Sequence, residues 1–165
     1  MARVQVAADS FPTDGDLTGD GKNWSVLTGT PPTPWKVVGG RATEYTDEHR
    51  SVVYGANTFQ NDQYATANLY GIDYNDPTYR AGVIVRASGS GATANYYGAW
   101  VTTTVGNYVL YVQKVVNNVG TNLHSGTVIS FALGDSLTLE VDGGATTKLR
   151  LYRNGSTLLV PEITD

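Results

Sequence analysis

The sequence predicts an all-β protein, an antiparallel β-sandwich built as a single domain over residues 1–165. Three observations predict this class. The chain has 19 glycines and 11 tyrosines but no blocks of helix-forming residues, which favours strands and turns. Short runs of alternating apolar and polar residues are separated by turn residues, as in sandwiches and barrels. A chain of 165 residues is long enough for one domain with a proper core.

The N-terminal third predicts three strands. The first is residues 3–8, and the next two are residues 24–27 and 35–38. An Asp/Gly-rich segment after the first strand is interpreted as a polar turn, because these residues favour turns. Three prolines in residues 30–34 exclude a central strand there, because proline has no backbone donor.

The middle of the chain alternates most regularly. Residues 64–69, 80–86 and 137–141 each place apolar side chains on one face. Long strands are also predicted at 95–101 and 107–116. The side chains expected to face the core are Ala65, Ala67, Leu69, Ala81, Val83, Val85, Leu137, Leu139 and Val141.

The end of the chain predicts a β-hairpin over residues 148–160. Its turn, Asn154–Gly155, fits a two-residue type I′ turn, in which both central residues have positive φ. In total the pattern gives about a dozen strands and no helix. This organisation predicts an antiparallel sandwich of the jelly-roll type.

Six segments spread over residues 9–160 resemble the concanavalin A-like lectin/glucanase superfamily, in particular its laminin-G-like branch. They are DSF…NW, NDQYATANL, AGVIVRAS, NYYGAWV, GDSLTLEVDG and LRLYRNGSTLL. Domains of this type usually continue after the final hairpin with one or two more strands, whereas this chain stops at PEITD. The resemblance therefore implies that either residues 3–8 fill that place or an edge stays open. An open edge predicts a homo-oligomer or docking onto a larger assembly.

Charge and hydropathy exclude several classes of partner. The net charge of −4 argues against nucleic acid, which requires clustered Lys and Arg. No apolar run is long enough for membrane insertion. The N-terminal residues lack the apolar region of a signal peptide, so we expect none in this chain. The absence of cysteine excludes disulfides and thiolate metal sites.

One pair of carboxylates is the candidate for catalysis. The resemblance implies, for glycosidases with this fold, two glutamates and an aspartate spaced along one strand, which hold two carboxyl groups close together. Glu140 and Asp142 match the start of that pattern, but Gly144 and Ala145 occupy the positions of the second glutamate. We therefore predict that the protein is not an enzyme.

Aromatic residues supply a candidate ligand site. Tyr96 and Trp100 share one face of their predicted strand, and Gly98 between them leaves room for a ligand. Aromatic rings of this kind pack on sugar rings, although packing within the protein is the alternative role. The residues on the opposite face, expected in the core if the tyrosine hydroxyl finds a partner, are Tyr97, Ala99 and Val101.

A polar loop supplies a second group of candidate ligand-binding residues. It lies between two predicted strands, where functional residues concentrate. The candidates in this loop are Tyr70, Asp73, Tyr74, Asn75, Asp76 and Tyr79.

The Asp/Gly-rich segment raises the question of calcium. Asp14, Asp16 and Asp20 have the spacing of oxygen ligands. An EF-hand loop also needs a glutamate at its twelfth position, which is Ser25 or Leu27 in the two registers. We therefore predict a turn and no cofactor, with a different kind of calcium site as the alternative.

These observations leave three function classes open. The favoured prediction is a non-catalytic surface or adhesion sandwich that displays a weak glycan-binding face, as a lectin does. In this prediction the chain is a structural subunit of a virion, such as a phage capsid decoration, fibre or tail component, or of another extracellular surface. The alternatives are a free-standing carbohydrate-binding module and a glycoside hydrolase, the latter disfavoured by the missing glutamate.

Overall fold

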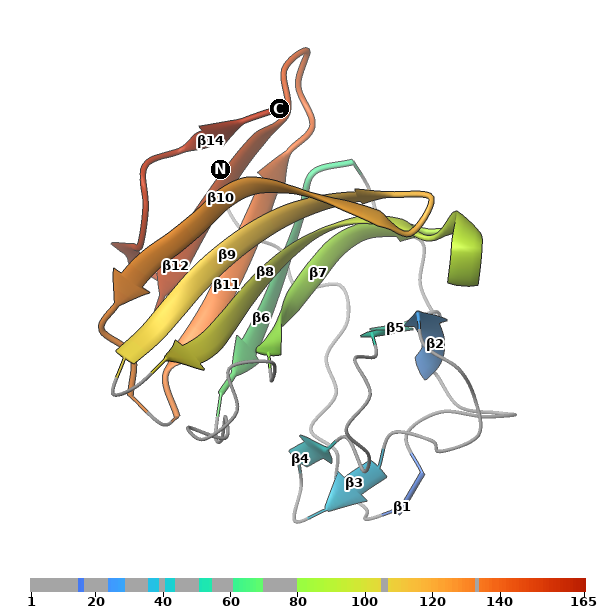
Figure 1. Cartoon of the computed structure of the whole chain (residues 1–165), viewed down its shortest axis with the longest axis horizontal. Helices are drawn as coiled ribbons and strands as arrows, with labels where there is room; N and C mark the ends of the chain where they lie inside the picture. Colours follow the sequence, from blue (N-terminus) through green and yellow to red (C-terminus); the bar gives the residue numbers. More distant parts are fainter. Residues whose placement is uncertain are drawn as a thin grey trace.

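The structure is a computed structural model that describes residues 15–16, 24–28, 36–38, 41–43, 51–54, 61–69, 80–104, 107–132 and 134–165 (Figure 1). The ranges before residue 61 are described by their backbone alone. Most of the described residues are in strands, and the helical part among them is one 3-10 turn, η1 (Gly91–Thr93). The predicted all-β class is confirmed.

One sheet contains four consecutive strands in the order β10-β9-β8-β7, all antiparallel. Its strands are β7 (Arg80–Ser88), β8 (Asn95–Thr104), β9 (Asn107–Val116) and β10 (Val119–Ile129). The predicted strand at 107–116 is confirmed at both ends, and those at 80–86 and 95–101 are each longer than predicted. Strand β10 was not predicted.

The second sheet has the order β13-β12-β11-β6, with β14 also pairing with β12. Its strands are β6 (Gln63–Asn68), β11 (Ser136–Asp142), β12 (Lys148–Arg153), β13 (Thr157–Leu158) and β14 (Ile163–Thr164). Strand β14 follows the final hairpin and pairs with Lys148 and Leu149 at the start of β12. Residues 3–8, predicted as an alternative neighbour, lie outside the described residues.

Shorter strands form a three-stranded sheet, β1-β3-β4, and a separate pair, β2-β5. They are β1 (Gly15–Asp16), β2 (Trp24–Thr28), β3 (Lys36–Val38), β4 (Arg41–Thr43) and β5 (Ser51–Tyr54). The predicted turn is wrong at Gly15–Asp16, because the backbone there pairs with Val37 and Lys36 of β3.

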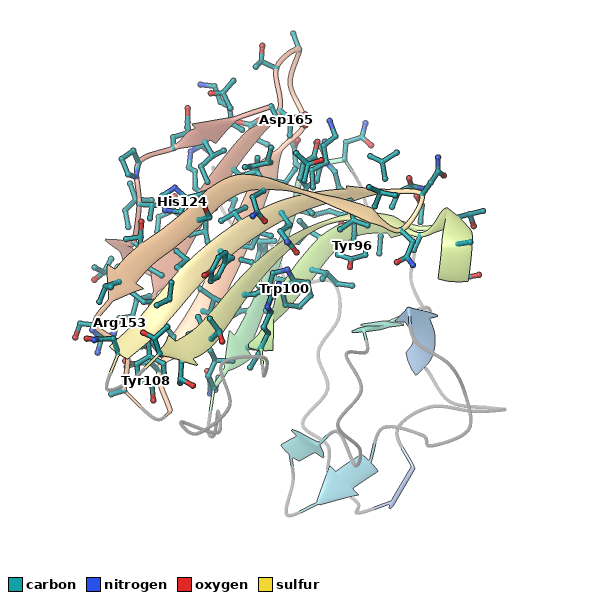
Figure 2. The ribbon with its side chains drawn as sticks, viewed as in Figure 1. Tyr96, Trp100, Tyr108, His124, Arg153 and Asp165 are labelled. Carbon is teal, nitrogen blue, oxygen red and sulfur yellow. The ribbon has the colours of Figure 1, made fainter. Side chains whose placement is uncertain are left out.

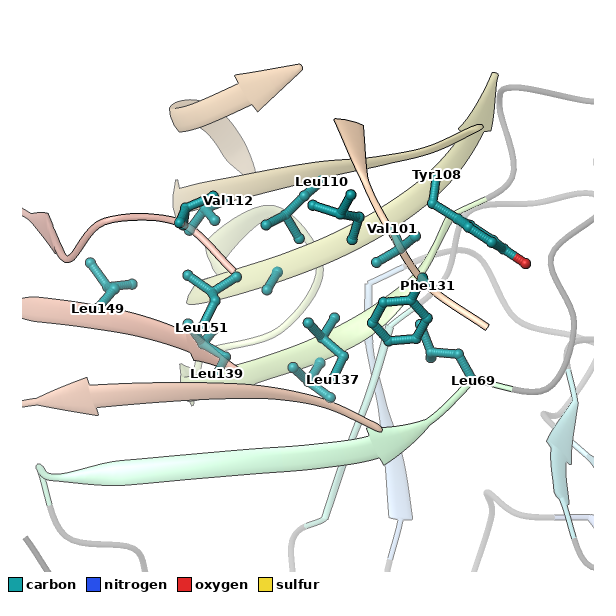
Figure 3. Packing of buried hydrophobic residues seen from close by; sticks show 14 of the residues in the cluster. Leu69, Val101, Tyr108, Leu110, Val112, Phe131, Leu137, Leu139, Leu149 and Leu151 are labelled. Carbon is teal, nitrogen blue, oxygen red and sulfur yellow. The ribbon is translucent and has the colours of Figure 1, made fainter. Parts of the chain in front are cut away.

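The hydrophobic core lies between the two larger sheets. Figure 3 shows Leu110 and Val112 of β9 facing Leu139 of β11 and Leu151 of β12. Every residue predicted to face the core either belongs to this cluster or packs against it. The predicted antiparallel sandwich is therefore confirmed, while its jelly-roll connectivity stays a prediction.

Two hairpin turns show how local sequence sets the strand register. Asn154 and Gly155 have the predicted positive φ values, 51° and 74°. The predicted two-residue loop is wrong, because Arg153 pairs with Thr157 and three residues lie between them. The two-residue type I′ geometry instead occurs at Asn117–Asn118, with φ values of 49° and 60°.

Polar side chains join the two sheets at one end of the sandwich. The Tyr97 hydroxyl of β8 donates to Oδ2 of Asp165 at 2.6 Å, so the predicted partner for this inward tyrosine exists. Lys114 Nζ of β9 donates to the same oxygen at 2.7 Å. The backbone of Asp165 pairs with that of Thr147 beside β12. These contacts fix the C-terminal strand across the end of the core.

Candidate functional site

The outward face of the β7–β10 sheet carries the candidate site. Strand residues that alternate with the core residues Val83, Ala99 and Leu110 point away from the second sheet. Figure 2 shows Tyr96 and Trp100 together on β8, on this side of the sandwich. The side chains that matter for the site are Arg80, Tyr96, Trp100, Tyr111, Gln113 and Asn122.

The Trp100 indole lies flat across two glycines. A Cβ atom at position 98 would lie 2.6 Å from Cζ2 and 3.0 Å from Nε1 of Trp100. A Cβ at position 82, directly opposite Trp100 on β7, would lie 2.9 Å from its Cε3. Because Gly82 and Gly98 have no side chains, the indole can lie directly on the backbone of the sheet. Trp100 is partly exposed.

Tyr96 forms one wall beside this ring. The two ring centroids are 6.3 Å apart with an angle of 87° between the planes, an edge-to-face contact. Tyr96 also pairs in register with the buried Val115 of β9. The Tyr96 ring is therefore nearly perpendicular to the Trp100 ring and lies beside it.

Arg80 and Tyr111 border the other side of the indole. Tyr111 of β9 is the direct cross-strand partner of Trp100. The Cζ atom of Arg80 lies 5.4 Å from the centroid of the Tyr111 ring, a cation–π contact that spans β8. Thr102, which lies on β8 opposite Arg80, is only 4% exposed.

Two amides lie farther along the same face. Nε2 of Gln113 on β9 donates to Oδ1 of Asn122 on β10 at 2.8 Å. The two residues are register partners, and Asn122 is exposed. Oε1 of Gln113 and Nδ2 of Asn122 do not take part in this bond, and within the described part of the chain they provide one acceptor and one donor.

The sheet that carries the site has no acidic residue. None of the four strands β7 to β10 contains Asp or Glu, although the whole chain has 15 acidic residues. The described acidic side chains all come from the other sheet or the segments that flank its strands. They are Asp62, Asp135, Glu140, Asp142, Glu162 and Asp165.

The carboxylates that suggested a glycosidase are engaged in ion pairs. Nη1 of Arg150 lies 3.0 Å from Glu140, and Nη2 lies 3.6 Å from Asp142. Arg150 Nε also donates to Glu162 at 2.7 Å. The hydrogen bond from Lys148 holds the pKa of the Glu162 carboxyl below its usual value, opposed by burial, with Arg150 adding to the effect. The carboxylates of Glu140, Asp142 and Glu162 therefore surround one guanidinium.

The predicted ligand residues fall into two groups. The structure brings Tyr96 and Trp100 into contact, whereas the loop candidates Tyr70, Asp73, Tyr74, Asn75, Asp76 and Tyr79 lie outside the described residues. The space predicted above Gly98 is filled, because the indole of Trp100 itself covers this glycine. A ligand can therefore approach the ring but not the glycine.

The predicted calcium ligands are not tested by the side chains that the structure describes. Asp14 and Asp20 lie outside the described residues, and Asp16 is described by its backbone in β1. Among the side chains that are described, no group of three His, Asp or Glu residues could hold a metal ion.

Sequence reasoning missed four members of the site, Arg80, Tyr111, Gln113 and Asn122. Alternation along the predicted strand 80–86 already placed Arg80 on the face opposite the core positions. The missing information was the register between strands. The two-residue turn at Asn117–Asn118 would have aligned Gln113 with Asn122, because it pairs Val116 with Val119.

Comparison of the chain with protein-family models, with curated proteins and with solved structures finds no match. The similarity to concanavalin A-like, laminin-G-like domains therefore stays a prediction from the sequence. No helix among the described residues is long and apolar enough to cross a membrane.

Proposed function

We propose that the protein is a non-catalytic surface or adhesion β-sandwich that binds a saccharide on the outward face of β7–β10. The observation that carries this proposal is the Trp100 indole, laid flat over Gly82 and Gly98 and bordered by Tyr96. A flat, partly exposed indole suits the apolar face of a pyranose ring. Oε1 of Gln113 and Nδ2 of Asn122, which take no part in the bond between the two amides, are suited to bind its hydroxyl groups.

The proposal predicts weak binding. A flat aromatic ring contacts one face of a sugar, so one or two sugar rings would bury little area there. Saccharides with several equivalent residues would gain apparent affinity if several copies of the site engaged them at once. This matches the display of many subunits on a particle or cell surface.

The test is affinity electrophoresis of the full chain in gels that contain soluble polysaccharides, both neutral and acidic. At least one polysaccharide should retard the protein. Trp100→Ala should reduce the retardation at least about tenfold, because the stacking surface is removed. Asn122→Ala provides a second variant, since Asn122 is exposed and its loss leaves the core intact.

The matched control is Tyr64→Ala, which removes a partly exposed aromatic side chain from β6 in the other sheet. This variant should bind as the wild-type protein does. Retardation by none of the polysaccharides would contradict the proposal. So would equal losses in the Trp100→Ala and Tyr64→Ala variants, because the effect would then not belong to the β7–β10 face.

The ion pairs of Arg150 support the non-catalytic part of the proposal. A retaining glycosidase needs one carboxyl group to be protonated and another to be free for attack. Glu140 and Asp142 instead face the same guanidinium. Release of reducing ends from a bound polysaccharide, abolished by Glu140→Gln, would replace this proposal with the glycosidase alternative.

The proposal includes assembly into a larger particle, such as a phage capsid decoration, fibre or tail component. Strand β10 supports it, because β10 is the last strand of its sheet in the described part of the chain. Val119 and Val128 on this strand are 69% and 60% exposed. Exposed edges with apolar side chains favour pairing with another chain.

Light scattering of the purified chain, with and without a chelator, tests assembly. An oligomer unchanged by the chelator is the expected result. A monomer would favour a free-standing carbohydrate-binding module. A mass that changes with the chelator would favour the calcium alternative at Asp14, Asp16 and Asp20.

A further inference from the structure

We propose that the saccharide recognised by this face is acidic, and that its carboxylate or sulfate group binds the guanidinium of Arg80. This inference rests on the proposed function, since it assigns the chemical class of the ligand at the same site. It is carried by three observations: the partners of Arg80, its position beside Trp100, and the charge of the sheet.

The first observation is that Arg80 differs from the other described basic residues. Lys114, Lys148, Arg150 and Arg153 each pair with a carboxylate. Nε of Arg86 donates to the carbonyl of Asn61 at 2.7 Å. Arg80 is exposed, and its guanidinium has no ion pair or hydrogen bond with any residue that the structure describes. Its contact is with the face of the Tyr111 ring.

The second observation is the position of this guanidinium. Arg80 and Gly82 face the same way on β7, separated by about 7 Å, and Trp100 covers Gly82. Tyr111, over which the guanidinium lies, is the direct cross-strand partner of Trp100. A substituent at the edge of a sugar ring stacked on Trp100 would thus lie within reach of Arg80.

The ring contact also orders the arginine before a ligand arrives. A guanidinium held against an aromatic ring loses rotational freedom but keeps its N–H donors. Those donors match the paired oxygens of a carboxylate or a sulfate. The cost of ordering this long side chain on binding is correspondingly lower.

The third observation is the distribution of charge. The protein as a whole carries a net charge of −4, which disfavours an anionic ligand at most of its surface. The strands β7 to β10 contain no acidic residue, so no carboxylate of these strands opposes an anion next to Trp100. Among the outward faces of the two large sheets, an anion is repelled least at this one.

The chemistry favours an acidic saccharide over a nucleic acid. A nucleic-acid strand carries one phosphate for each nucleotide and is bound through several basic side chains. This face presents one arginine beside two amides and aromatic rings. A single anionic group on a hydroxyl-rich ring matches that set.

The experiment compares two matched ligands, an oligosaccharide of neutral hexoses and the corresponding oligosaccharide of uronic acids. Dissociation constants for the full chain are measured by calorimetry at low and high salt. We expect the acidic ligand to bind more tightly, and the difference to decrease at high salt. Arg80→Gln should weaken acidic binding roughly tenfold or more and weaken neutral binding much less, because a neutral ring has no anionic group for the guanidinium to bind.

Two further variants separate local from general charge effects. Lys148→Gln removes the same charge from the other sheet, where Lys148 pairs with Glu162, and should leave both dissociation constants unchanged. Arg80→Lys keeps the positive charge but lacks the planar guanidinium that can donate two parallel hydrogen bonds. Its affinity for the acidic ligand should lie between those of the wild-type protein and Arg80→Gln.

The outcomes distinguish this inference from the function on which it rests. Tighter binding of the neutral ligand, or equal losses for both ligands in Arg80→Gln, would overturn the inference and leave the saccharide site standing. Binding of both ligands by Trp100→Ala with the affinity of the wild-type protein would overturn the inference and the proposed function together. Tighter binding of a single-stranded oligonucleotide than of either saccharide, lost in Arg80→Gln, would also overturn the inference.

Discussion

The two large sheets share one core but differ in what their outward faces carry. On β11 and β12, the outward side chains Glu140 and Arg150 neutralise each other at 3.0 Å, and Asp142 and Glu162 belong to the same network. On β8 and β9, the outward side chains include aromatic rings and amides, and neither strand contains a carboxylate. On the first face the charged side chains pair with one another. The second face has a partly exposed indole and an arginine that makes no ion pair with any described residue.

On the second face, Trp100 has both a structural role in the sheet and a proposed role in ligand binding. Glycine weakens a strand because it offers no side chain to pack. An aromatic ring laid across the glycines restores that packing, so Trp100 stabilises the sheet by covering Gly98. In this position Trp100 stays partly exposed. One face of the indole packs on the glycines and stabilises the sheet. We propose the opposite face as the one that contacts a ligand.

The largest expected effect concerns what the two sheets have in common. Leu110 of β9 and Leu139 of β11 are fully buried and point into the same core. Leu110→Ala and Leu139→Ala should each lower the free energy of unfolding by about 2–5 kcal/mol, because each leaves a cavity. Urea denaturation measures this loss.

The control for this prediction is Val128→Ala, on the outward side of β10, where Val128 is 60% exposed. Its effect should stay within about 0.5 kcal/mol. A small loss for only one of the two leucine variants would mean that the sheets do not share the core equally.

The second prediction tests the contact between Gly98 and the indole of Trp100. Gly98→Ala places a Cβ atom 2.6 Å from Cζ2 of Trp100, so the ring must move outward. We expect a loss of about 1–3 kcal/mol in the free energy of unfolding from this overpacking. Saccharide binding should weaken as well, since the flat platform is lost, and calorimetry with the same oligosaccharides measures it.

Gly120→Ala is the matched control, on β10 of the same sheet. A Cβ there would meet its nearest neighbour, Nε2 of Gln113, at 3.7 Å, an ordinary contact. Stability should change little in this variant. Equal effects of the two substitutions would show that the loss comes from replacing any glycine of this sheet and not from the contact with Trp100.

The fold could be predicted from the sequence wherever one face of a strand is buried. Alternation identified the core side of β6, β7 and β11, because a buried face forces apolar side chains into every second position. The same signal is absent from β10, an edge strand rich in polar residues and glycine. Its register also shifts twice, between Asn122 and His124 and between His124 and Thr127. Such bulges break the period that a strand prediction requires.

The candidate site could be predicted only in part, since it depends on neighbours in different strands. Tyr96 and Trp100 lie four residues apart on one strand, so the sequence alone places them on one face. The contact of Arg80 with Tyr111 joins β7 to β9 across β8. That pairing needs the register of both hairpins, which side-chain alternation does not supply.

The smallest expected effect concerns the contact that joins the two sheets. The sheet without acidic residues provides the donors, Tyr97 and Lys114, and the acidic sheet provides the acceptor, Asp165. The hydrogen bond from Lys114, and then that from Tyr97, hold the pKa of the Asp165 carboxyl below its usual value. Burial, and then the bond to Asp165, raise the pKa of the Tyr97 hydroxyl. The hydrogen bond to Asp165 is the largest cause that raises the pKa of Lys114.

These directions fix the pH dependence of the contact. A carboxyl whose pKa is lower in the folded state stabilises the fold above its unfolded pKa, near pH 4, and loses that contribution as the pH falls through the folded value. Tyr97 and Lys114 have raised pKa values, so their contribution is complete below about pH 10 and is lost as the pH rises through the folded values. Asp165→Asn should therefore lower the free energy of unfolding by a roughly constant amount between about pH 5 and pH 9.

Urea denaturation of the wild-type protein and the Asp165→Asn variant across the pH range measures this difference. The loss should be smaller than that of Gly98→Ala, because Lys114 and Asp165 are 39% and 19% exposed and water competes for their contact. It should shrink towards zero below pH 4, as the wild-type carboxyl becomes protonated, and again above pH 10. A difference that stays constant through both ends of the range would contradict this assignment, because the contact between the sheets would then not depend on the charge of Asp165.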